Sequence, residues 1–275
     1  MRLSGYQPQY FPRLHFFARA LDSDIFEISD YLQFVKKHAY PMPDGRTKRG
    51  KSFQSDTPIK LHQGESFLTI PVQRKRLLPL THTTIEYGQP WQEKHLASIR
   101  SGYGKAVNFN SLYPEISAII QKQHDSLSSL NVSTFLWALT KILGIRDTDL
   151  AQLSVSSVNR LLEKKHPFRL RKIVLISETN IEAPDDDRDA TDWIIDMCRI
   201  FGANEYYYGG TSAAAYMNFE KLKRRKISLI EQHWVCQPYR QQFPKFGFLP
   251  NLSILDLLLN EHENTITSCL STRNG

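Results

Sequence analysis

Apolar and polar positions follow two different periods over the first thirty residues. Residues 1–3 are a short apolar start, residues 14–21 carry apolar side chains at helical spacing, and residues 24–30 are rich in β-favouring side chains. The pattern predicts a strand, a helix and a second strand, which form a βαβ unit with a right-handed crossover and parallel strands. The carboxyl ends of the two strands then meet, so Gln7 and Asp30 are predicted to share one edge of the sheet.

The segment 5–12, Gly-Tyr-Gln-Pro-Gln-Tyr-Phe-Pro, connects this first strand to the helix. A residue before proline is biased toward extended backbone, which predicts that Gln7 and Phe11 are extended. Pro12 suits the first helical position, because its missing N–H would have no helical partner there. Ligands of α/β proteins bind where strands end and helices begin. Two interpretations are open: a ligand-binding turn, or a rigid turn filled by Tyr10 and Phe11.

The next part of the chain is predicted to contain a loop, two strands and a group of helices. Residues 40–58 are rich in proline, glycine, lysine and serine, as in a long loop. Residues 66–72 and 83–87 are predicted strands, and Pro71 indicates an edge position or a strand end. Helical spacing then predominates, which predicts a helical insertion over about residues 91–165.

Strand and helix alternate again in the second half of the chain. The apolar run 172–177 is typical of a strand buried on both faces in a parallel sheet. The acidic residues 185–187 precede a predicted helix at 193–201, where the helix dipole favours negative charge, so they are interpreted as a helix start and not as a metal site. The strand 205–208 ends in a turn before another helix, a geometry that presents free N–H groups to an anion. This turn consists of Gly209, Gly210, Thr211 and Ser212.

The chain is predicted to close with a strand at 227–230, a helix from Asn251 onward and a frayed tail at 263–275. No internal repeat or linker divides it. We therefore predict a single α/β domain over residues 1–262, with a Rossmann-like, largely parallel sheet and a helical insertion.

Composition narrows the class of protein. The chain of 275 residues is 41% hydrophobic, which is ordinary for a globular protein. It has neither a signal-peptide pattern nor an apolar run approaching the ~20 residues of a membrane helix, so we expect a cytoplasmic protein without a membrane span. The three cysteines are far apart and the nine histidines form no recognised ligand pair, so no metal site is predicted.

The net charge is +7, and basic residues cluster in four short segments. One interpretation is an anionic partner, such as a phosphate, a nucleotide, a nucleic acid or a membrane surface. The other is that the clusters belong to solvated faces and loops. The segments are 46–51, 74–76, 169–172 and 221–226.

Seven short motifs follow one another between residues 3 and 260. They are Gln7-Pro8 with Tyr10-Phe11-Pro12; Asp30 with Gln33-Phe34; Phe67 to Val72; Trp91 with Lys94-His95 and Tyr103; Tyr208-Gly209-Gly210 with Tyr216; Tyr239 with Gln241; and Ser253 to Asp256. In this order they resemble the WbqC-like protein family. Two departures stand out: the basic segment 40–58 replaces the family's short W-x-N-R segment, and Phe67 stands where a tryptophan is usual.

The resemblance implies a role in the biosynthesis of O-antigen or other surface polysaccharides. It also implies a transferase that adds acyl or aminoacyl groups to amino sugars. The opening βαβ unit is similar to that of nucleotidyltransferase-type (HUP-like) enzymes such as pantothenate synthetase, a fold-level analogy that concerns architecture more than reaction.

The first functional hypothesis is a transferase acting on a nucleotide-linked or phosphorylated small molecule. Its partner would be a small anionic substrate, and its ligand a nucleotide or nucleotide-sugar. His95 and Asp30 are the predicted catalytic residues, because a histidine titrates near neutrality and a carboxylate can serve as a base. The predicted substrate-binding residues are Gln7, Tyr10, Gln33, Lys94, Gly209, Gly210, Thr211 and Ser212.

Two other classes stay open. The basic segment 46–51 and the tyrosines at 206–208 are compatible with a nucleic-acid-binding or nucleic-acid-modifying protein. The lack of a recognised catalytic triad or metal motif is compatible with a non-catalytic scaffold in a biosynthetic complex. Individual residues also have structural alternatives: His95 as a helix-surface imidazole, and Asp256 as a buried carboxylate that needs a polar partner.

Overall fold

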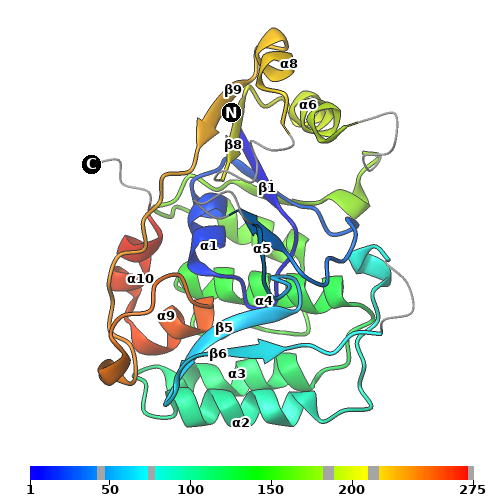
Figure 1. Ribbon diagram of the computed structural model, residues 1–275. Coiled ribbons are helices and arrows are strands. Elements are labelled where there is room, and N and C mark those ends of the chain that lie inside the picture. Colours follow the sequence, from blue (N-terminus) through cyan, green and yellow to red (C-terminus); the bar gives the residue numbers. More distant parts are fainter. Residues whose placement is uncertain (42–46, 74–77, 182–188, 210–216, 272–275) are drawn as a thin grey trace.

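The structure, a computed structural model, describes residues 1–41, 47–73, 78–181, 189–209 and 217–271, apart from the side chains of residues 39–41 and 47–49. Figure 1 shows a sheet with helices on both faces in the upper part of the molecule, and a hairpin with further helices below it.

Five parallel strands form the central sheet in the described part of the chain, in the order β7-β2-β1-β8-β9. β1 lies in the middle, where Leu3 pairs with Ile25 on one side and with Tyr206 on the other. The strand order reverses between β1 and β8, so this is the topological switch point at which α/β proteins bind ligands. The strands are β1 (Arg2–Tyr6), β2 (Ile25–Ile28), β7 (Lys172–Leu175), β8 (Glu205–Tyr208) and β9 (Ser228–Glu231).

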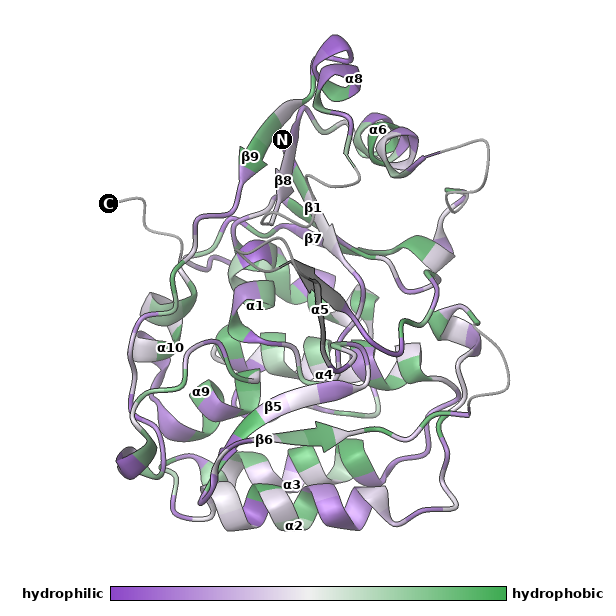
Figure 2. Cartoon of the chain, in the orientation of Figure 1, coloured by the Kyte–Doolittle hydropathy of each residue, from purple (hydrophilic) through white to green (hydrophobic). Residues whose placement is uncertain are grey.

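Each face of the sheet has its own apolar core, because successive side chains of a strand point to opposite faces. On one face, Phe16 of α1 and Phe135 of α4 pack on Phe26 of β2, with ring centroids 5.2 to 5.8 Å apart. On the other face, Ile25 of β2 packs with Met197 of α6. Figure 2 shows green, apolar segments within this layered region and a mostly purple, hydrophilic tip at α8. The helices are α1 (Leu14–Leu21), α4 (Leu127–Ile142), α6 (Ala190–Ile200) and α8 (Phe219–Arg224).

The chain between β2 and β7 forms two hairpins and a group of helices. β3 (Ala39–Pro41) pairs with β4 (Thr47–Arg49), and β5 (Asp56–Leu61) pairs with β6 (Gly64–Thr69), both antiparallel. The remaining helices before β7 are α2 (Trp91–Tyr103), α3 (Phe109–Gln121) and α5 (Val155–Leu162), and the chain closes with α9 (Ile254–Asn260) and α10 (Glu263–Leu270). Short 3₁₀ helices lie at Leu80–His82, Ile176–Glu178 and Pro244–Phe246.

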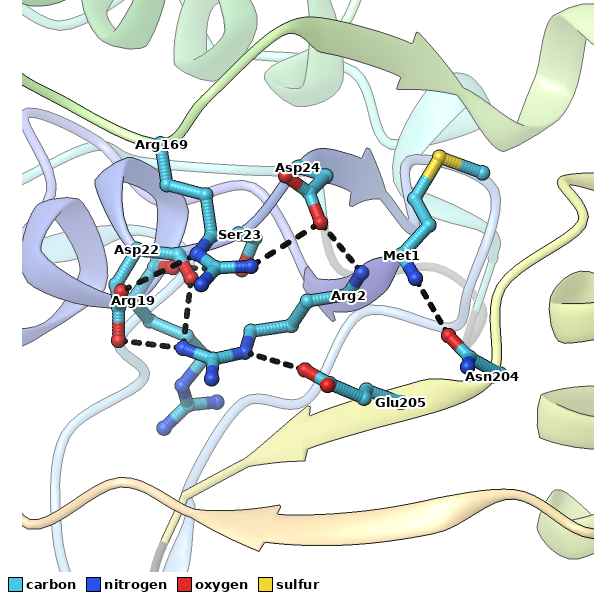
Figure 3. Close-up of polar contacts among 9 residues, drawn as sticks. All are labelled: Met1, Arg2, Arg19, Asp22, Ser23, Asp24, Arg169, Asn204 and Glu205. Atoms are coloured by element: carbon cyan, nitrogen blue, oxygen red, sulfur yellow. Dashed lines mark hydrogen bonds and ion pairs between the residues drawn. The ribbon is translucent and has the colours of Figure 1, made fainter.

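Oppositely charged side chains close the amino-terminal edge of the sheet (Figure 3). The Arg2 guanidinium lies 2.8 Å from the Asp22 carboxylate and 3.1 Å from that of Glu205. Arg169 lies 3.8 Å from Asp22 and 3.3 Å from Asp24. These pairs join β1, β8 and the turn before β2 at their amino ends, opposite the edge where a ligand is expected.

Side chains from three distant segments hold the backbone of Phe11. The Phe11 N–H donates to Thr134 Oγ1 at 3.0 Å, and its carbonyl accepts from Thr57 Oγ1 at 2.9 Å and Ser253 Oγ at 3.0 Å. Phe11 has φ = 37°, in the left-handed region, so the prediction of extended backbone before Pro12 was wrong. These three hydrogen bonds outweigh the local preference set by the proline.

Several predictions from the pattern are confirmed. The helix at 14–21 has the predicted bounds, and Gln7 and Asp30 follow the paired strands β1 and β2 at one edge of the sheet. The class is mixed α/β with a mostly parallel sheet, as predicted, whereas the HUP-like assignment stays a prediction. No helix in the described segments has the length and apolarity needed to cross a bilayer.

Other predictions were wrong because tertiary contacts decided the structure. Residues 40–58, predicted as one loop, contain part of β3, all of β4 and the start of β5. β5 forms because Gly64, with φ = 100°, turns the chain back for β6 to pair with it. Residues 83–87 do not form a strand; Ile85 makes one isolated bridge to Val72. Pro12 precedes the helix, whose N-cap is Arg13.

The tail was also predicted incorrectly. Residues 263–270, expected to fray, form α10, because Ile266, Cys269 and Leu270 are buried against the core around α1 and α4. The helix predicted from Asn251 begins at Ile254, after the N-cap Ser253.

An asparagine side chain covers the edge strand β7. Asn159 of α5 donates to the Ile173 carbonyl at 2.9 Å and accepts from the Ile173 N–H at 2.8 Å, as a neighbouring strand would. An unpaired strand edge would otherwise be a template for association with another chain.

We predict that Asn159→Ala lowers the free energy of unfolding by about 1–3 kcal/mol, because it leaves two backbone groups of a buried residue without partners. Urea denaturation measures the loss. Arg160→Ala, at an exposed position of the same helix, is the matched control and should change stability by less than about 0.5 kcal/mol. Equal effects of the two substitutions would contradict the role given to Asn159.

Candidate functional site

A cavity of about 410 Å³ lies at the carboxyl ends of β1, β2 and β8, at the switch point of the sheet. Its size is typical of a small-molecule site. We call it the switch-point cavity. The residues that line it include Gly5, Gln7, Arg19, Glu27, Ser29, Trp193 and Gly209.

Glu27 brings a carboxyl group into this cavity from the middle of β2, where it is only 2% exposed. Ser29 Oγ lies 2.9 Å from both carboxyl oxygens. Burial raises the pKa of Glu27 to about 8; the hydrogen bond from Ser29 opposes the shift, and the nearby Asp30 adds to it. A carboxyl group that titrates near neutral pH is suited to proton transfer.

Gly5 makes room for this carboxyl group. A Cβ atom at Gly5 would lie 1.6 Å from Glu27 Oε1, so no larger residue fits while Glu27 keeps its position. Gly5 does not have a positive φ, and its backbone would accept other residues. Glycine is therefore required here by the neighbouring side chain and not by the backbone.

Arg19 brings a positive charge into the same cavity from the last turn of α1. It is 8% exposed, its Nε donates to Gln232 Oε1 at 2.9 Å, and its guanidinium lies 4.6 Å from the centre of the Tyr6 ring. A Cβ atom at Gly209 would lie 1.5 Å from Nη2, so this glycine accommodates the guanidinium as Gly5 accommodates Glu27. Within the described residues, the Nη atoms have no hydrogen-bond acceptor.

Gln7 adds a further donor. Gln54 accepts from the Val35 N–H at 2.6 Å through its oxygen, and its Nε2 donates to Gln7 Oε1 at 2.6 Å. With its oxygen engaged, Gln7 retains its own amide NH₂ group to donate within the cavity it lines. Trp193 also lines the cavity, and its indole N–H is buried without a hydrogen-bond partner in the described chain. Arg19 and Gln7 therefore present unused donors to the cavity, whereas the indole N–H of Trp193 is buried beyond its reach.

Asp30, predicted as a catalytic base, faces away from this cavity. Its carboxylate accepts from the Ser177 N–H at 2.9 Å and from the Ser177 hydroxyl, so it links the end of β2 to the turn after β7. Asp30 is 3% exposed, and it influences the cavity through its charge near Glu27. Gln33 is exposed, and its carbonyl accepts from Gln54 at 3.3 Å.

His95 and Tyr10 form a buried pair away from the switch-point cavity. His95 Nε2 lies 3.1 Å from the Thr69 carbonyl and so carries the proton, and Nδ1 lies 3.2 Å from the Tyr10 hydroxyl and so accepts. Burial lowers the pKa of His95 to about 4, and the hydrogen bond to Thr69 opposes the shift. Both ring nitrogens are engaged, which suits a neutral, positioning imidazole. The catalytic role of His95 and the substrate contact of Tyr10 stay predictions.

The other predicted residues are spread over different parts of the molecule. Lys94 is exposed on α2 and lines a separate groove next to His95. Gly209 lines the switch-point cavity, and its part in an anion-binding turn stays a prediction. The remainder of that turn, Gly210, Thr211 and Ser212, lies outside the described residues.

Four residues from the sequence motifs meet in a buried network instead of a cavity. Asp256 is fully buried and accepts from Tyr103 at 2.9 Å, Tyr239 at 2.6 Å and Gln241 at 2.8 Å. Burial raises the pKa of Asp256, and these three hydrogen bonds oppose the shift. The expectation that a buried Asp256 needs partners is confirmed, and the network joins α2, α9 and the segment before α9.

Sequence patterns pointed to neither Glu27 nor Arg19. Each is a charged residue within an apolar run, Ile-Phe-Glu-Ile and Phe-Ala-Arg-Ala-Leu, and that interruption is the signal that could have identified them. Within the described residues, no group of three or more histidine, cysteine, aspartate or glutamate side chains could hold a metal ion.

The fold and the cavity together define an α/β protein with a donor-rich site at the switch point of a parallel sheet. The chain belongs to the WbqC-like protein family, whose model matches residues 7–268. No curated protein and no solved structure matches the chain.

We predict that Glu27 makes the protein less stable as pH rises. Its pKa is 4.5 when exposed and about 8 in the fold, so folding takes up a proton between these values. The folded state is then disfavoured by up to about 1.4 kcal/mol per pH unit across that window. The difference in unfolding free energy between Glu27→Gln and wild type, measured in urea, should grow in favour of the variant from about pH 5 to pH 8.

The comparison with Glu27→Gln is needed because other groups act in the opposite direction. Burial lowers the pKa of His15 to about 3 and of His38 to about 4, so these histidines favour the folded state as pH rises toward 6.5. Their contribution cancels in the difference between the two proteins. A difference that stays constant with pH would show that Glu27 is ionised in the fold.

We further predict that Gly5→Ala lowers the unfolding free energy by about 1–3 kcal/mol through the clash with Glu27. The double variant Gly5→Ala/Glu27→Ala should lose less than the sum of the single substitutions, with a coupling of roughly 0.5–3 kcal/mol. Gly88→Ala is the control, since its methyl group would meet only the flexible end of Glu86. Additive effects at Gly5 and Glu27 would rule out the steric explanation.

Proposed function

We propose that the protein is a transferase that acts on a nucleotide-linked or phosphorylated small molecule in the switch-point cavity. The observation that carries the proposal is the pair of unused donor groups there, from Arg19 and Gln7. A ligand rich in acceptors would satisfy both, and its negative charge would pair with the guanidinium.

Glu27 supplies the acid–base chemistry in this proposal. An amine or hydroxyl attacks the carbon of an activated acyl group; a new bond to nitrogen or oxygen forms, and the leaving group departs with its electron pair. The surplus proton of the nucleophile passes to the Glu27 carboxylate. With a pKa of about 8, the ionised form that accepts this proton becomes more abundant as pH rises toward 8.

Membership of the WbqC-like protein family supports the biological context. The family is associated with O-antigen and other surface polysaccharides, and the acceptor would then be an amino sugar. Asp30 and His95 have supporting roles in this scheme: Asp30 holds the turn after β7 and keeps a negative charge near Glu27, and His95 fixes the side chain of Tyr10 within the β1–α1 turn.

The test is a thermal-shift screen of nucleotides, nucleotide-sugars and acyl carriers against wild type, Arg19→Gln and Glu27→Gln. A ligand that binds only the folded protein, at a free concentration of about 100 times its dissociation constant, stabilises the fold by about 2.7 kcal/mol. We expect Arg19→Gln to lose this shift, because the anion loses its counter-charge. Glu27→Gln should keep the shift and lose turnover of the same ligand.

Arg160→Gln, at an exposed position on α5, is the matched control and should retain both shift and turnover. If no small molecule shifts the melting temperature, and Gln7→Ala and Arg19→Gln retain cellular activity, the enzyme hypothesis fails. Stabilisation by nucleic acid alone, falling steeply with salt, would instead favour the nucleic-acid-binding alternative.

A further inference from the structure

A second hollow, of about 830 Å³, lies between the β5–β6 hairpin and the first turns of α2. Its floor is apolar and includes Phe34, Ile70 and Trp91, which are buried. Four lysines line it: Lys36, Lys37, Lys51 and Lys94. We call it the lysine groove.

The charge in this groove is unbalanced. Asp56 is the one carboxylate among its described lining residues, and its oxygens already accept from Thr69 at 2.5 Å and Ser55 at 3.1 Å and lie 3.5 Å from Lys51. In the described chain, Lys36, Lys37 and Lys94 have no carboxylate partner. His95 also lines the groove, but burial keeps it neutral at pH 7 and it adds no charge.

The lysine groove is separate from the switch-point cavity. Segments 34–38 and 50–54 form the wall between them: Phe34 and Lys36 line the groove, whereas Val35 and His38 line the cavity. Gln54, within this wall, accepts a hydrogen bond from the Val35 N–H of the other wall segment and donates one to Gln7, which lines the cavity. A ligand in the groove therefore does not use Arg19 or Glu27.

We infer that the lysine groove binds the diphosphate group of a small phosphorylated molecule. The lysines come from different elements, Lys94 from α2 and Lys36 and Lys37 from the segment after β2. The two linked phosphates of a diphosphate offer these lysines more negative charge and more acceptor oxygens than a single phosphate does. The apolar floor accommodates the organic part of the molecule.

A nucleic acid fits the groove less well. Single strands bind by stacking bases on open aromatic faces. Here Trp91 is 4% exposed and Phe34 9% exposed, and Lys51 lies over the Phe67 ring at 4.8 Å. The groove has the charge for a polyanion but no free aromatic platform among its described residues.

Calorimetric titration with inorganic pyrophosphate tests the inference, with orthophosphate and oligothymidylates of increasing length as competitors. Pyrophosphate should bind more tightly than orthophosphate. Lys94→Ala and the double variant Lys36→Ala/Lys37→Ala should each weaken pyrophosphate binding on the order of tenfold, the loss expected for a hydrogen bond between charged groups.

Lys105→Ala, just beyond the other end of α2, is the matched control and should bind as wild type does. Arg19→Gln should also leave pyrophosphate binding unchanged, which separates this inference from the proposed function. The inference is overturned if the lysine variants bind pyrophosphate as wild type does, or if Arg19→Gln abolishes pyrophosphate binding. It is also overturned if orthophosphate binds as tightly as pyrophosphate. Affinity for oligothymidylate that rises with length and exceeds that for pyrophosphate would overturn it in favour of a nucleic acid. The substituted lysines are exposed, and unchanged melting temperatures verify that the variants fold.

Discussion

The backbone of Phe11 is the point on which the arrangement of the molecule depends. Thr57 and Ser253 donate to its carbonyl and Thr134 accepts from its N–H, so the β5 hairpin, α4 and the start of α9 all meet the turn between β1 and α1. The left-handed backbone there costs of order 1–3 kcal/mol and persists only because these contacts over-determine it. The same turn sets where β1 ends, and so where Gln7 enters the switch-point cavity.

The cavity itself follows from a second constraint, the accommodation of an acidic and a basic side chain by two glycines. Glu27 occupies the space that a side chain at Gly5 would fill, and Arg19 occupies the space at Gly209. β1 and β8 are neighbours at the switch point, so a glycine in β1 and a glycine directly after β8 leave room for a carboxyl group and a guanidinium at one sheet edge. A buried charge without a partner is costly, and an anionic ligand at Arg19 would reduce that cost.

The pattern of apolar and polar residues predicts much of the fold, but it predicts less of the chemistry of the site. The βαβ unit and its shared edge followed from periodicity and the right-handed crossover, and both are present. Asp30 does lie at that edge, but its side chain turns to Ser177, a residue almost 150 positions away whose approach no local pattern encodes. Glu27 was missed because a single acidic residue in an apolar strand gives no local sign of a cavity. The space for its carboxyl group depends on Gly5 in the adjacent strand β1, and this approach becomes visible only when the two strands are paired.

The wall between the two hollows shows how these constraints connect. Gln54 is fully buried, and Asn131 of α4 donates to its carbonyl at 2.7 Å and to the Pro8 carbonyl at 3.1 Å. One side chain from the core thus holds both the wall and the β1–α1 turn. A displacement of segment 50–54 would move the Gln54 amide and, through its 2.6 Å bond, the donor that Gln7 presents. The lysine groove and the switch-point cavity are therefore two sites on one polar scaffold, and Gln54 with its partners is one route by which occupation of either can affect the other.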